Sequence, residues 1–426
     1  MRNAKLGALV AGAVIVFAAC NSGGAATTAP SGGAGGDTSK GTVKIAIELP
    51  QQGSENAASA PIINGIKLAV KDAGGAAGGY KIDIPQSAIY DDAVNGAHDP
   101  QTGAKNMQAI VADPDIVAVI GPLNSSVAKA QIPISNEAGL LQCSPANTNE
   151  GLTKPEFGAL DIRKAHPDVI NYVRVVTTDD NQGPAAARYI IQKLGKKNVY
   201  IVDDTETFGK GIADNFEKEF KAEGGTVVAR DGVPKTTTDY TSIMTAAKAK
   251  NPDSIYFGGV TATGGARILK AAVQAGLAVP YVGPDGIYDG SATTKDSFLN
   301  LAGDDAKNAF ATAAAVGDYP GKAEFEAKYK AEYGTSPTGY SATGYACAQV
   351  VIDALKRAGA TNPSKDQLKE AVRKAAVDPT VKYDSVIGQF QFDANGDTSQ
   401  KIISIYDYDP TAKDWAFKEQ LDFAQK

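Results

Sequence analysis

The sequence predicts an α/β protein built from two doubly wound lobes, and three observations lead to this fold class. From residue 43 onward, strand-like and helix-like segments alternate, which is typical of parallel sheets covered by helices. The second third of the chain repeats the order of the first, so two units of similar topology are expected. The chain has 426 residues, of which 43% are hydrophobic and 21% charged, enough for two or three domain-sized cores.

The first unit opens with the β-branched apolar segment 42–49, which has the pattern of a buried strand. Segment 60–75 carries apolar residues at helical spacing and ends in Gly74-Gly75, a pair that stops helices. Further strands are expected at 80–92, 116–122 and 140–148, and further helices at 100–113 and 125–139.

The second unit repeats this order of strands and helices. The turn before a strand is also repeated, because Asp113-Pro114 in the first unit corresponds to Asn251-Pro252 in the second. Strands are expected at 197–204, 226–234, 254–259 and 280–286, and helices at 208–225, 239–252 and 263–276.

The remaining part of the chain, 310–426, is too short and irregular for a third unit. It predicts two or three helices, one of which places Phe325, Tyr329 and Tyr333 on one face as core residues. Strand-like segments follow at 386–393 and 401–409. We expect this part to complete both lobes, so the chain crosses a multi-strand hinge between them. The expected division is 43–177 plus 311–392 for the first lobe and 178–310 plus 393–426 for the second.

The N-terminus has the pattern of a bacterial lipoprotein signal. Arg2 and Lys5 form a basic head, and the apolar stretch that follows is too short to span a membrane comfortably. We expect residues 1–19 to be a signal peptide cleaved before a lipidated Cys20. Phe17 departs from the leucine usual at its position, and an ordinary secretory signal with an incidental cysteine is the alternative.

The segment after Cys20 is rich in glycine, serine, threonine and alanine, with almost nothing to bury. Residues 20–42 are therefore expected to form a flexible tether. A tether behind a lipid anchor would hold a folded body close to the cell membrane.

Two further cysteines, Cys143 and Cys347, lie in apolar stretches. We expect them to be buried free thiols. A disulfide between them stays open as an alternative, because an exported protein could form one.

The composition argues against several classes of protein. The net charge is −6 and the basic residues form no stripe, so no nucleic-acid partner is expected. His98 and His166 lie far apart, and no Cys or His spacing indicates zinc. Asp91-Asp92 could hold a cation, but two acids at a strand end are more often solvated or capping. We expect no metal.

Sequence motifs for catalysis or cofactor binding are lacking. The loop after the first strand, ELPQQGSEN, has no G-x-G-x-x-G pattern, and neither a P-loop nor a G-x-S-x-G elbow occurs. The sequence therefore predicts a protein that is not an enzyme and needs no cofactor.

Hydroxyl side chains and one acid follow the predicted strands where ligands bind in doubly wound folds. Hydroxyls and free N–H groups at helix starts suit a carboxylate, and Asp285 in the other lobe could pair with an ammonium. Helix capping explains each hydroxyl taken alone, and a turn explains Asp285. Together they predict an amino acid clamped between two lobes. The hydroxyls are Ser125, Ser126, Thr148, Thr261 and Thr263.

Seven short motifs carry a resemblance to a known family. They are YDDA at 90–93, VIGPLNSS at 119–126, SPANTNEGLT at 144–153, DNQGPAAARYI at 180–190, FGKGIAD at 208–214, YFGG at 256–259 and GPDG at 283–286. With them, residues 43–426 resemble the branched-chain amino acid (Leu/Ile/Val) binding proteins of bacterial ABC transporters. That family has the periplasmic binding protein type I fold, with two Rossmann-like lobes that close on a ligand.

The resemblance implies a role for four residues. Ser125 and Thr148 would hold the ligand carboxylate, the carbonyl of Ala146 would accept from its ammonium, and Asp285 would pair with that ammonium. Asp285 is one methylene shorter than the glutamate common at its position.

The walls of the expected pocket depart from the family pattern. Val260 stands where an aromatic residue is common and is followed by Thr261, while Phe208 replaces a tyrosine and lacks its hydroxyl. We expect a carboxylate seat like that of the family and a changed side-chain pocket. Relatives with this fold bind amides, urea or aromatic acids.

The resemblance implies a monomeric, extracytoplasmic solute-binding protein that delivers an amino acid or a related small carboxylate or amide to an ABC importer. Its partners would be permease subunits with their ATPases, and the lipid on Cys20 would attach it to the membrane. The alternative function is a sensing module that passes cleft closure to a separate signalling protein.

Overall fold

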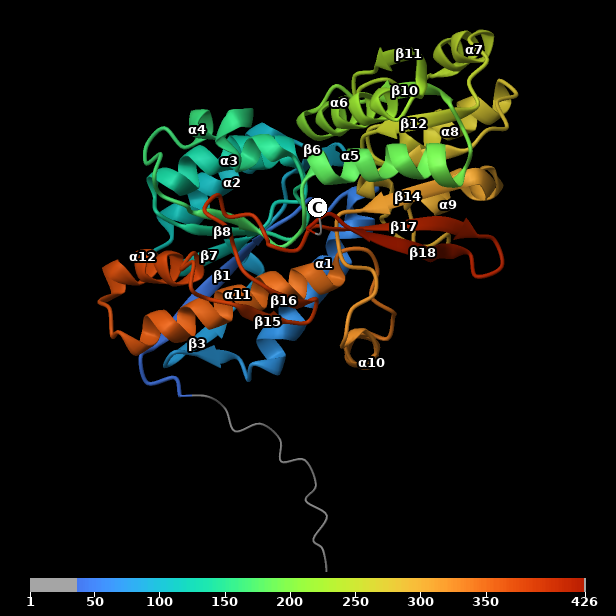
Figure 1. Ribbon diagram of the computed structural model, residues 1–426. Helices are drawn as coiled ribbons and strands as arrows, with labels where there is room; N and C mark the ends of the chain where they lie inside the picture. Colours follow the sequence, from blue (N-terminus) through green and yellow to red (C-terminus); the bar gives the residue numbers. More distant parts are fainter. Residues whose placement is uncertain (1–36, 425–426) are drawn as a thin grey trace, which may run out of the picture. The chain divides into compact units, whose positions relative to one another are not determined.

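The computed structural model describes residues 37–424, which form two sheets covered by helices (Figure 1). The first sheet has the strand order β2-β3-β1-β7-β8-β9, with β4 beside β1. Its strands are β1 (Thr42–Glu48), β2 (Ala76–Ala77), β3 (Tyr80–Asp83), β4 (Ile89–Tyr90), β7 (Ile116–Ile120), β8 (Leu141–Ser144) and β9 (Tyr172–Arg174).

The second sheet has the order β11-β10-β12-β13-β14-β17-β18. Its first five strands are parallel, and β17 and β18 add an antiparallel edge. Its strands are β10 (Asn198–Asp203), β11 (Thr226–Gly232), β12 (Ser254–Gly258), β13 (Tyr281–Gly283), β14 (Ala309–Ala313), β17 (Ile402–Asp409) and β18 (Asp414–Asp422).

The two sheets share one topology, which confirms the predicted duplication. In the first sheet, β1 pairs in parallel with β3 on one side and with β7 on the other, and β8 and β9 continue the sheet. In the second sheet, β10 pairs in the same way with β11 and β12, and β13 and β14 continue it. This is the doubly wound arrangement. Its strand order changes direction at the first strand, and the loops that follow the strands on either side of that point meet at the carboxyl edge of the sheet.

The helices of the first lobe come from both ends of the chain. The long helix α11 packs on α1, and Gly65 of α1 permits the close approach because a Cβ there would lie 2.1 Å from the carbonyl oxygen of Ser341. These helices are α1 (Glu55–Asp72), α2 (Pro100–Ala112), α3 (Ser125–Glu137), α4 (Ala159–Ile162), α10 (Lys322–Tyr333), α11 (Ser341–Ala360) and α12 (Lys365–Ala376).

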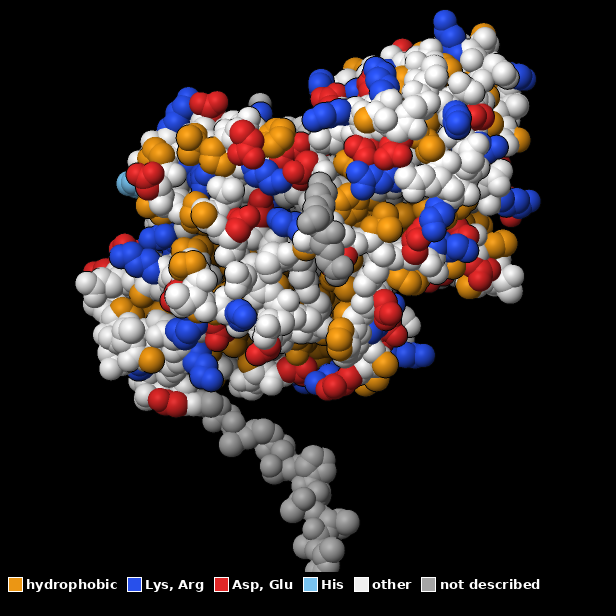
Figure 2. Space-filling model, in the orientation of Figure 1, with side chains coloured by type: hydrophobic (Ala, Val, Ile, Leu, Met, Phe, Trp, Pro, Cys, Tyr) orange, Lys and Arg blue, Asp and Glu red, His pale blue; other side chains and the backbone are white. Residues whose placement is uncertain are grey.

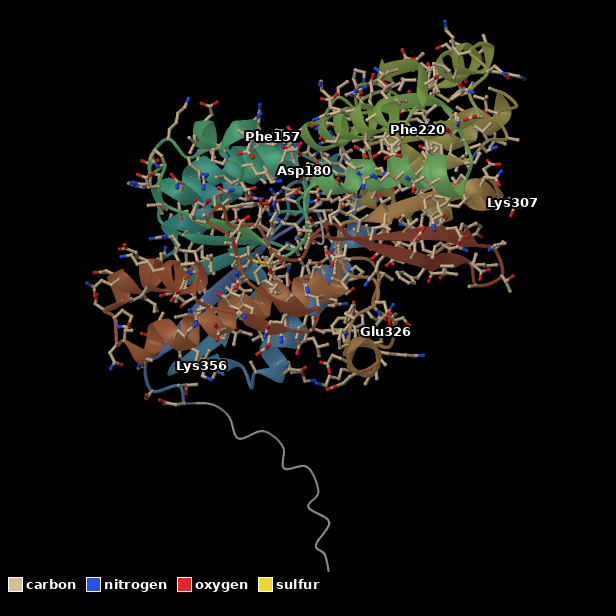
Figure 3. All side chains as sticks on the ribbon, viewed as in Figure 1. Phe157, Asp180, Phe220, Lys307, Glu326 and Lys356 are labelled. Carbon is tan, nitrogen blue, oxygen red and sulfur yellow. A yellow bond between two sulfur atoms is a disulfide. The ribbon has the colours of Figure 1, made fainter. Side chains whose placement is uncertain are left out.

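The helices of the second lobe bury their apolar faces as the periodicity predicts. In α6, Ile212, Phe216 and Phe220 repeat every four residues and are fully buried, and Figure 3 labels Phe220 within this lobe. The helices are α5 (Asp179–Arg188), α6 (Thr207–Ala222), α7 (Thr241–Ala249), α8 (Gly265–Gln274) and α9 (Phe298–Ala302).

The chain passes between the lobes three times: after β9, after β14 and before β17. Residues 311–313, which we assigned to the first lobe, pair with β13 and β17 and so lie in the second sheet. Phe325 and Tyr329 of α10 are buried in the first core, as predicted.

Other predictions need correction. The expected strand 80–92 is interrupted after β3, where Pro85 precedes a single 3₁₀ turn (Gln86–Ala88) before β4. The strands β9, β14 and β18 were not predicted, and neither was helix α5. Two short hairpins also form, β5 (Ala93–Val94) with β6 (Ala97–His98) and β15 (Tyr383–Ser385) with β16 (Gly388–Phe390).

The expectation of free thiols is wrong. Cys143 of β8 and Cys347 of α11 are both fully buried and form a disulfide across 204 residues of sequence. The sulfur atoms are visible where α11 covers the first sheet (Figure 3). The bond ties the C-terminal helix of the first lobe to its N-terminal sheet.

The predicted signal peptide and Cys20 lie outside the described residues, as does most of the tether. At the end of the expected tether, the amide of Lys40 donates to the carbonyl of Gly79 at 2.8 Å, and β1 begins at Thr42. Within residues 37–424, no helix combines the length and apolar character needed to cross a bilayer.

Charged side chains of both signs are mixed over the face of the molecule shown in Figure 2. Among the described residues, charged side chains of opposite sign form ion pairs, such as Arg188 with Glu219 and Arg230 with Asp203. The surface view therefore agrees with the mixed charge pattern of the sequence.

Candidate functional site

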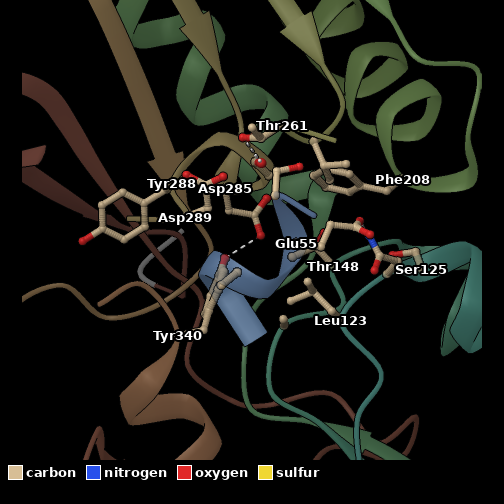
Figure 4. Close-up of a pocket in the computed structure, with 16 residues that line it drawn as sticks. Glu55, Leu123, Ser125, Thr148, Phe208, Thr261, Asp285, Tyr288, Asp289 and Tyr340 are labelled. Carbon is tan, nitrogen blue, oxygen red and sulfur yellow. Dashed lines mark hydrogen bonds between the residues drawn. The ribbon is translucent and has the colours of Figure 1, made fainter. Parts of the chain in front are cut away.

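A cavity lies between the carboxyl ends of the two sheets (Figure 4). Its walls come from loops of both lobes, from the start of α1 and from Tyr340, the residue before α11. The lining residues are Ser54, Glu55, Ala58, Leu123, Asn124, Ser125, Ala146, Thr148, Phe208, Val260, Thr261, Asp285, Gly286, Tyr288, Asp289 and Tyr340.

The first-lobe face contains the start of α3. The chain leaves β7 through Gly121, whose φ of +137° and contact with the backbone of Glu48 leave no room for a side chain. Ser125 is the first helical residue, so free N–H groups and the positive end of the helix dipole point toward the cavity. The side chain of Asn124 does not cap the helix but donates to Glu55 Oε1 at 2.8 Å.

The loop after β8 forms the second part of this face. The Ser144 hydroxyl accepts from the amide of Asn147 at 2.9 Å, and the Asn147 side chain donates to the carbonyl of Leu123 at 2.7 Å. Tyr172 donates to the same side chain at 2.8 Å. These bonds join the two loops that carry Ser125 and Thr148 and fix their relative positions.

A buried ion pair supports this loop from behind. Arg174 and Asp397 are both fully buried, and Arg174 Nη1 donates to the carbonyls of Asn147 and Asn149 at 3.2 and 2.7 Å. Burial favours a raised pKa for Asp397, but Arg174 beside it outweighs burial and holds the pKa below its usual value. The carboxylate is therefore ionised, and the guanidinium stays in place behind Thr148.

The second-lobe face contains two buried acids on the loop after β13. Asp285 accepts from Gln182 Nε2 at 2.9 Å through one oxygen and from the Tyr340 hydroxyl through the other. Burial raises the pKa of Asp285 to about 6. Gln182 is held by Thr312 at 3.0 Å, so α5, β14 and α11 all orient this carboxyl.

Asp289 lies four residues further along and also lines the cavity (Figure 4). Its Oδ1 accepts from the amide of Phe298 at 2.8 Å, whereas Oδ2 is buried without a hydrogen-bond donor among the described residues. The neighbouring Thr261 hydroxyl donates to the carbonyl of Gly286 at 3.4 Å. Burial raises the pKa of Asp289 to about 7.

The third acid of the cavity, Glu55, is neutralised by His98. The amide and ring Nδ1 of His98 lie 2.6 and 2.7 Å from the two oxygens of Glu55. Burial favours a lower pKa for His98, but Glu55 and Glu206 outweigh it and raise the pKa to about 10. The neighbouring His98 lowers the pKa of Glu206, on the second lobe, to about 2. His98 is therefore an imidazolium between two carboxylates.

Polar contacts cross the cleft beside the cavity. His98 Nε2 lies 3.8 Å from Glu206, and Lys235 donates to the carbonyl of His98 at 3.3 Å. Asn215 of α6 donates to Glu150 at 2.7 Å. These contacts join the two lobes.

Seven of the nine residues predicted for the site line this cavity: Ser125, Ala146, Thr148, Phe208, Val260, Thr261 and Asp285. Ser126 and Thr263 do not line it. Ser126 is buried without a partner among the described residues, and Thr263 donates to Asp204 at 2.7 Å.

Sequence reasoning missed several residues of the site. Glu55, Tyr340 and Asp289 line the cavity, and His98 and Gln182 lie directly behind its walls. Asp289 carried a signal as a second acid near the GPDG motif, and Gln182 lies in the quoted motif DNQGPAAARYI. Glu55, Tyr340 and His98 lie outside the quoted motifs.

The acids at the end of the predicted strand 80–92 also differ from expectation. Asp92 is fully buried rather than solvated, and burial raises its pKa well above the usual value. Asp91 accepts from the amide of Gln51 at 2.8 Å. Within residues 37–424, no group of three or more His, Cys, Asp and Glu side chains is placed to hold a metal ion.

Comparison with known proteins decides the family. The sequence profile of the family described as periplasmic binding protein matches residues 42–409. The chain belongs to this family. Its members are solute-binding proteins rather than enzymes, and its type I fold is the duplicated arrangement described above.

Relatives within the family include the leucine-specific-binding protein of Salmonella typhimurium, 28% identical over 78% of this chain and 82% of that protein. The fold is shared with a leucine-binding protein from Thermotoga maritima, with a TM-score of 0.76, 24% identity, and coverage of 90% and 99% of the two chains. It is also shared with a solute-binding protein of an ABC transporter from R. palustris in complex with benzoate, with a TM-score of 0.73, 19% identity, and coverage of 90% and 98%.

Proposed function

We propose that this periplasmic binding protein is the ligand-binding subunit of an ABC importer and carries an α-amino acid or a closely related small carboxylate. The observation that supports the proposal most strongly is the polarity of the cavity. Hydroxyls and a helix N-terminus form the first-lobe face, and buried carboxyls form the second. Such a cavity is complementary to a zwitterion.

In this proposal Ser125 and Thr148 donate to the ligand carboxylate, together with the free amides at the start of α3. The carbonyl of Ala146 and the carboxyl of Asp285 receive the ammonium. An ammonium beside Asp285 would favour its ionised form, because an opposite charge lowers a carboxyl pKa. Phe208 and Val260 form the apolar part of the wall.

Closure of the lobes would follow from the placement of these groups on both of them. A ligand held by Ser125 and Thr148 completes the interactions of Asp285 only when the second lobe lies over it. The ligand therefore binds the closed form more tightly and shifts the population toward it. The cross-cleft contacts of His98 and Asn215 would add to the same equilibrium.

The permease with its ATPases and the lipid on Cys20 belong to the same proposal. Relatives with this fold include binding proteins of ABC transporters. An extracytoplasmic position agrees with the family and with the Cys143–Cys347 disulfide, since such bonds persist outside the reducing cytosol.

Calorimetry with free amino acids and their carboxyl-blocked forms tests the proposal. We expect at least one free amino acid among leucine, isoleucine, valine and the polar amino acids to bind. Its carboxamide or methyl ester should bind at least about tenfold more weakly, because the blocked group loses charge-assisted bonds. Equal affinity for free and blocked forms would remove Ser125 and Thr148 from the site.

A further inference from the structure

The cavity contains more carboxyl groups than one ammonium can pair with. Three acids line it, Glu55, Asp285 and Asp289, and none of its described lining residues is Lys, Arg or His. Glu55 is already balanced, because both of its oxygens accept from His98 and the imidazolium lies against it. Two acids of the second lobe remain.

The two remaining acids differ in how they are satisfied. Each oxygen of Asp285 has a donor, from Gln182 and from Tyr340. Asp289 has one donor, the amide of Phe298, and its Oδ2 is buried without any among the described residues. Asp289 is 5% exposed. A buried acceptor without a donor is destabilising, and such groups in native proteins call for an explanation.

The wall around Asp289 is also polar. The Thr261 hydroxyl interacts with Asp289 and opposes the effect of burial on its pKa. Thr261 and Val260 stand where the resemblance led us to expect a changed pocket, and Val260 replaces an aromatic side chain. The ring of Tyr288 points away from the cavity and stacks on Tyr406, with ring centroids 4.2 Å apart, so it does not shield Asp289 (Figure 4). A branched aliphatic side chain would leave the free oxygen of Asp289 unsatisfied.

We propose that Asp289 selects ligands whose side chain ends in an N–H donor, either an amide or a cationic nitrogen, over branched aliphatic amino acids. The inference rests on the proposed function, since it assigns the α-amino and α-carboxyl groups of the ligand to Asp285 and to the first-lobe face. The second nitrogen then donates to Asp289 Oδ2. The ligand supplies the donor that the protein lacks at this atom.

Matched ligand pairs test this selectivity in calorimetry with the full chain. Asparagine and leucine have side chains of nearly equal shape, and lysine is norleucine with one added ammonium. We expect the N–H-bearing member of at least one pair to bind at least about tenfold more tightly. A cationic side chain should release protons on binding near pH 7, seen by comparing buffers of different ionisation heat, because burial raises the pKa of Asp289 to about 7. An amide should release few.

Two variants connect the preference to Asp289. Asp289→Leu removes the acceptor, and both pairs should lose their preference. Asp289→Asn keeps an acceptor but no charge, so a preference for asparagine should survive while one for lysine is lost. If the leucine variant fails to fold, the asparagine variant still tests the cationic case. Asp304→Asn, at an exposed acid of the same lobe, is the matched control and should change nothing.

The outcomes separate this inference from the proposed function. If leucine binds through its carboxylate, as the blocked analogues report, and binds as tightly as asparagine, the selectivity of Asp289 is disproved and the proposed function stands. If an N–H-bearing ligand is preferred and Asp289→Leu leaves that preference intact, Asp289 is not its cause. If no amino acid binds, both proposals fail.

Discussion

The two faces of the cleft differ although the lobes share one topology. On the first-lobe face, Ser125 and Thr148 lie on loops that hydrogen bonds join to each other. Behind these loops, the positive charge of Arg174 is balanced by the negative charge of Asp397. On the second-lobe face, Asp285 and Asp289 are buried carboxyls with raised pKa values and no cation among the lining residues. The first face is braced from behind by hydrogen bonds and an ion pair, whereas the second has two carboxyls that no lining cation balances.

This difference shows where the specificity of such a cavity can reside. A braced face of hydroxyls and helix amides suits the carboxylate that every amino acid has. An incomplete acidic face suits groups that differ between ligands. The variants below should therefore affect the stability of the protein through the first lobe and its affinity for ligands through the second.

The largest effect is expected at the support of the first face. Arg174→Met should destabilise the protein by about 3–5 kcal/mol, because it leaves Asp397 buried without its partner. Urea unfolding measures the change. The double variant Arg174→Met/Asp397→Leu should recover part of it, since no unpaired charge remains. A loss below about 1 kcal/mol in the single variant would show that the pair does not support the lobe.

Loss of the Cys143–Cys347 disulfide of the first lobe should have the second-largest effect on stability. Replacing Cys143 and Cys347 by alanine should lower the free energy of unfolding by about 2–4 kcal/mol, because the bond closes a long loop in the unfolded chain. A reducing agent should destabilise the wild-type chain to a similar extent and leave the variant unchanged. Equal unfolding curves with and without reductant would contradict the bond.

On the second face, Asp285→Asn should weaken amino-acid binding by on the order of 1.5–3 kcal/mol through loss of a charge-assisted bond. The variant keeps the donors Gln182 and Tyr340 in contact with a side chain of the same shape. Calorimetry gives the dissociation constant. An unchanged constant would remove Asp285 from the ammonium site.

Single hydroxyl deletions on the first face should matter less. Ser125→Ala and Thr148→Val should each weaken binding by about 1 kcal/mol, since the helix amides and the other hydroxyl still hold the carboxylate. The effect should disappear for carboxyl-blocked ligands. If it persists with them, the hydroxyls act on another part of the ligand.

The smallest effect is expected at the contact between His98 of the first lobe and Glu206 of the second. Glu206→Gln should reduce stability by under about 1 kcal/mol. The pKa of His98 is raised to about 10 from 6.5, so its contribution is full below pH 6.5 and is lost as the pH rises through about 10. The pKa of Glu206 is lowered to about 2 from 4.5, so its contribution is full above pH 4.5 and is lost as the pH falls through about 2.

The difference between wild type and Glu206→Gln should therefore be largest between pH 4.5 and 6.5 and shrink toward pH 10. Urea unfolding across this range measures it. The exposed Glu156 provides a control, and Glu156→Gln should show no such pH profile. A difference that grows with pH would contradict the assigned charge of His98.

Local patterns predicted the duplicated fold and the residues of one face, because strands, helix starts and the loops after them are local. Ser125 and Thr148 follow strands directly, so the topology places them at one edge. Asp285 was found for the same reason.

Residues that depend on tertiary packing could not be found in this way. Glu55 begins a helix seven residues after β1, and Tyr340 reaches Asp285 from the start of α11. The pairing of Cys143 with Cys347 depends on α11 covering the first sheet, across 204 residues. Asp92 was expected to be solvated or capping, and it is fully buried.

A crystal structure of the chain with the tightest-binding amino acid of the panel tests the central claim most directly. The account predicts the ligand carboxylate within hydrogen-bond distance of Ser125 and Thr148, and its α-nitrogen against Asp285. A ligand in the reverse orientation, with its carboxylate on the second-lobe face, would contradict it, as would a ligand bound outside this cavity.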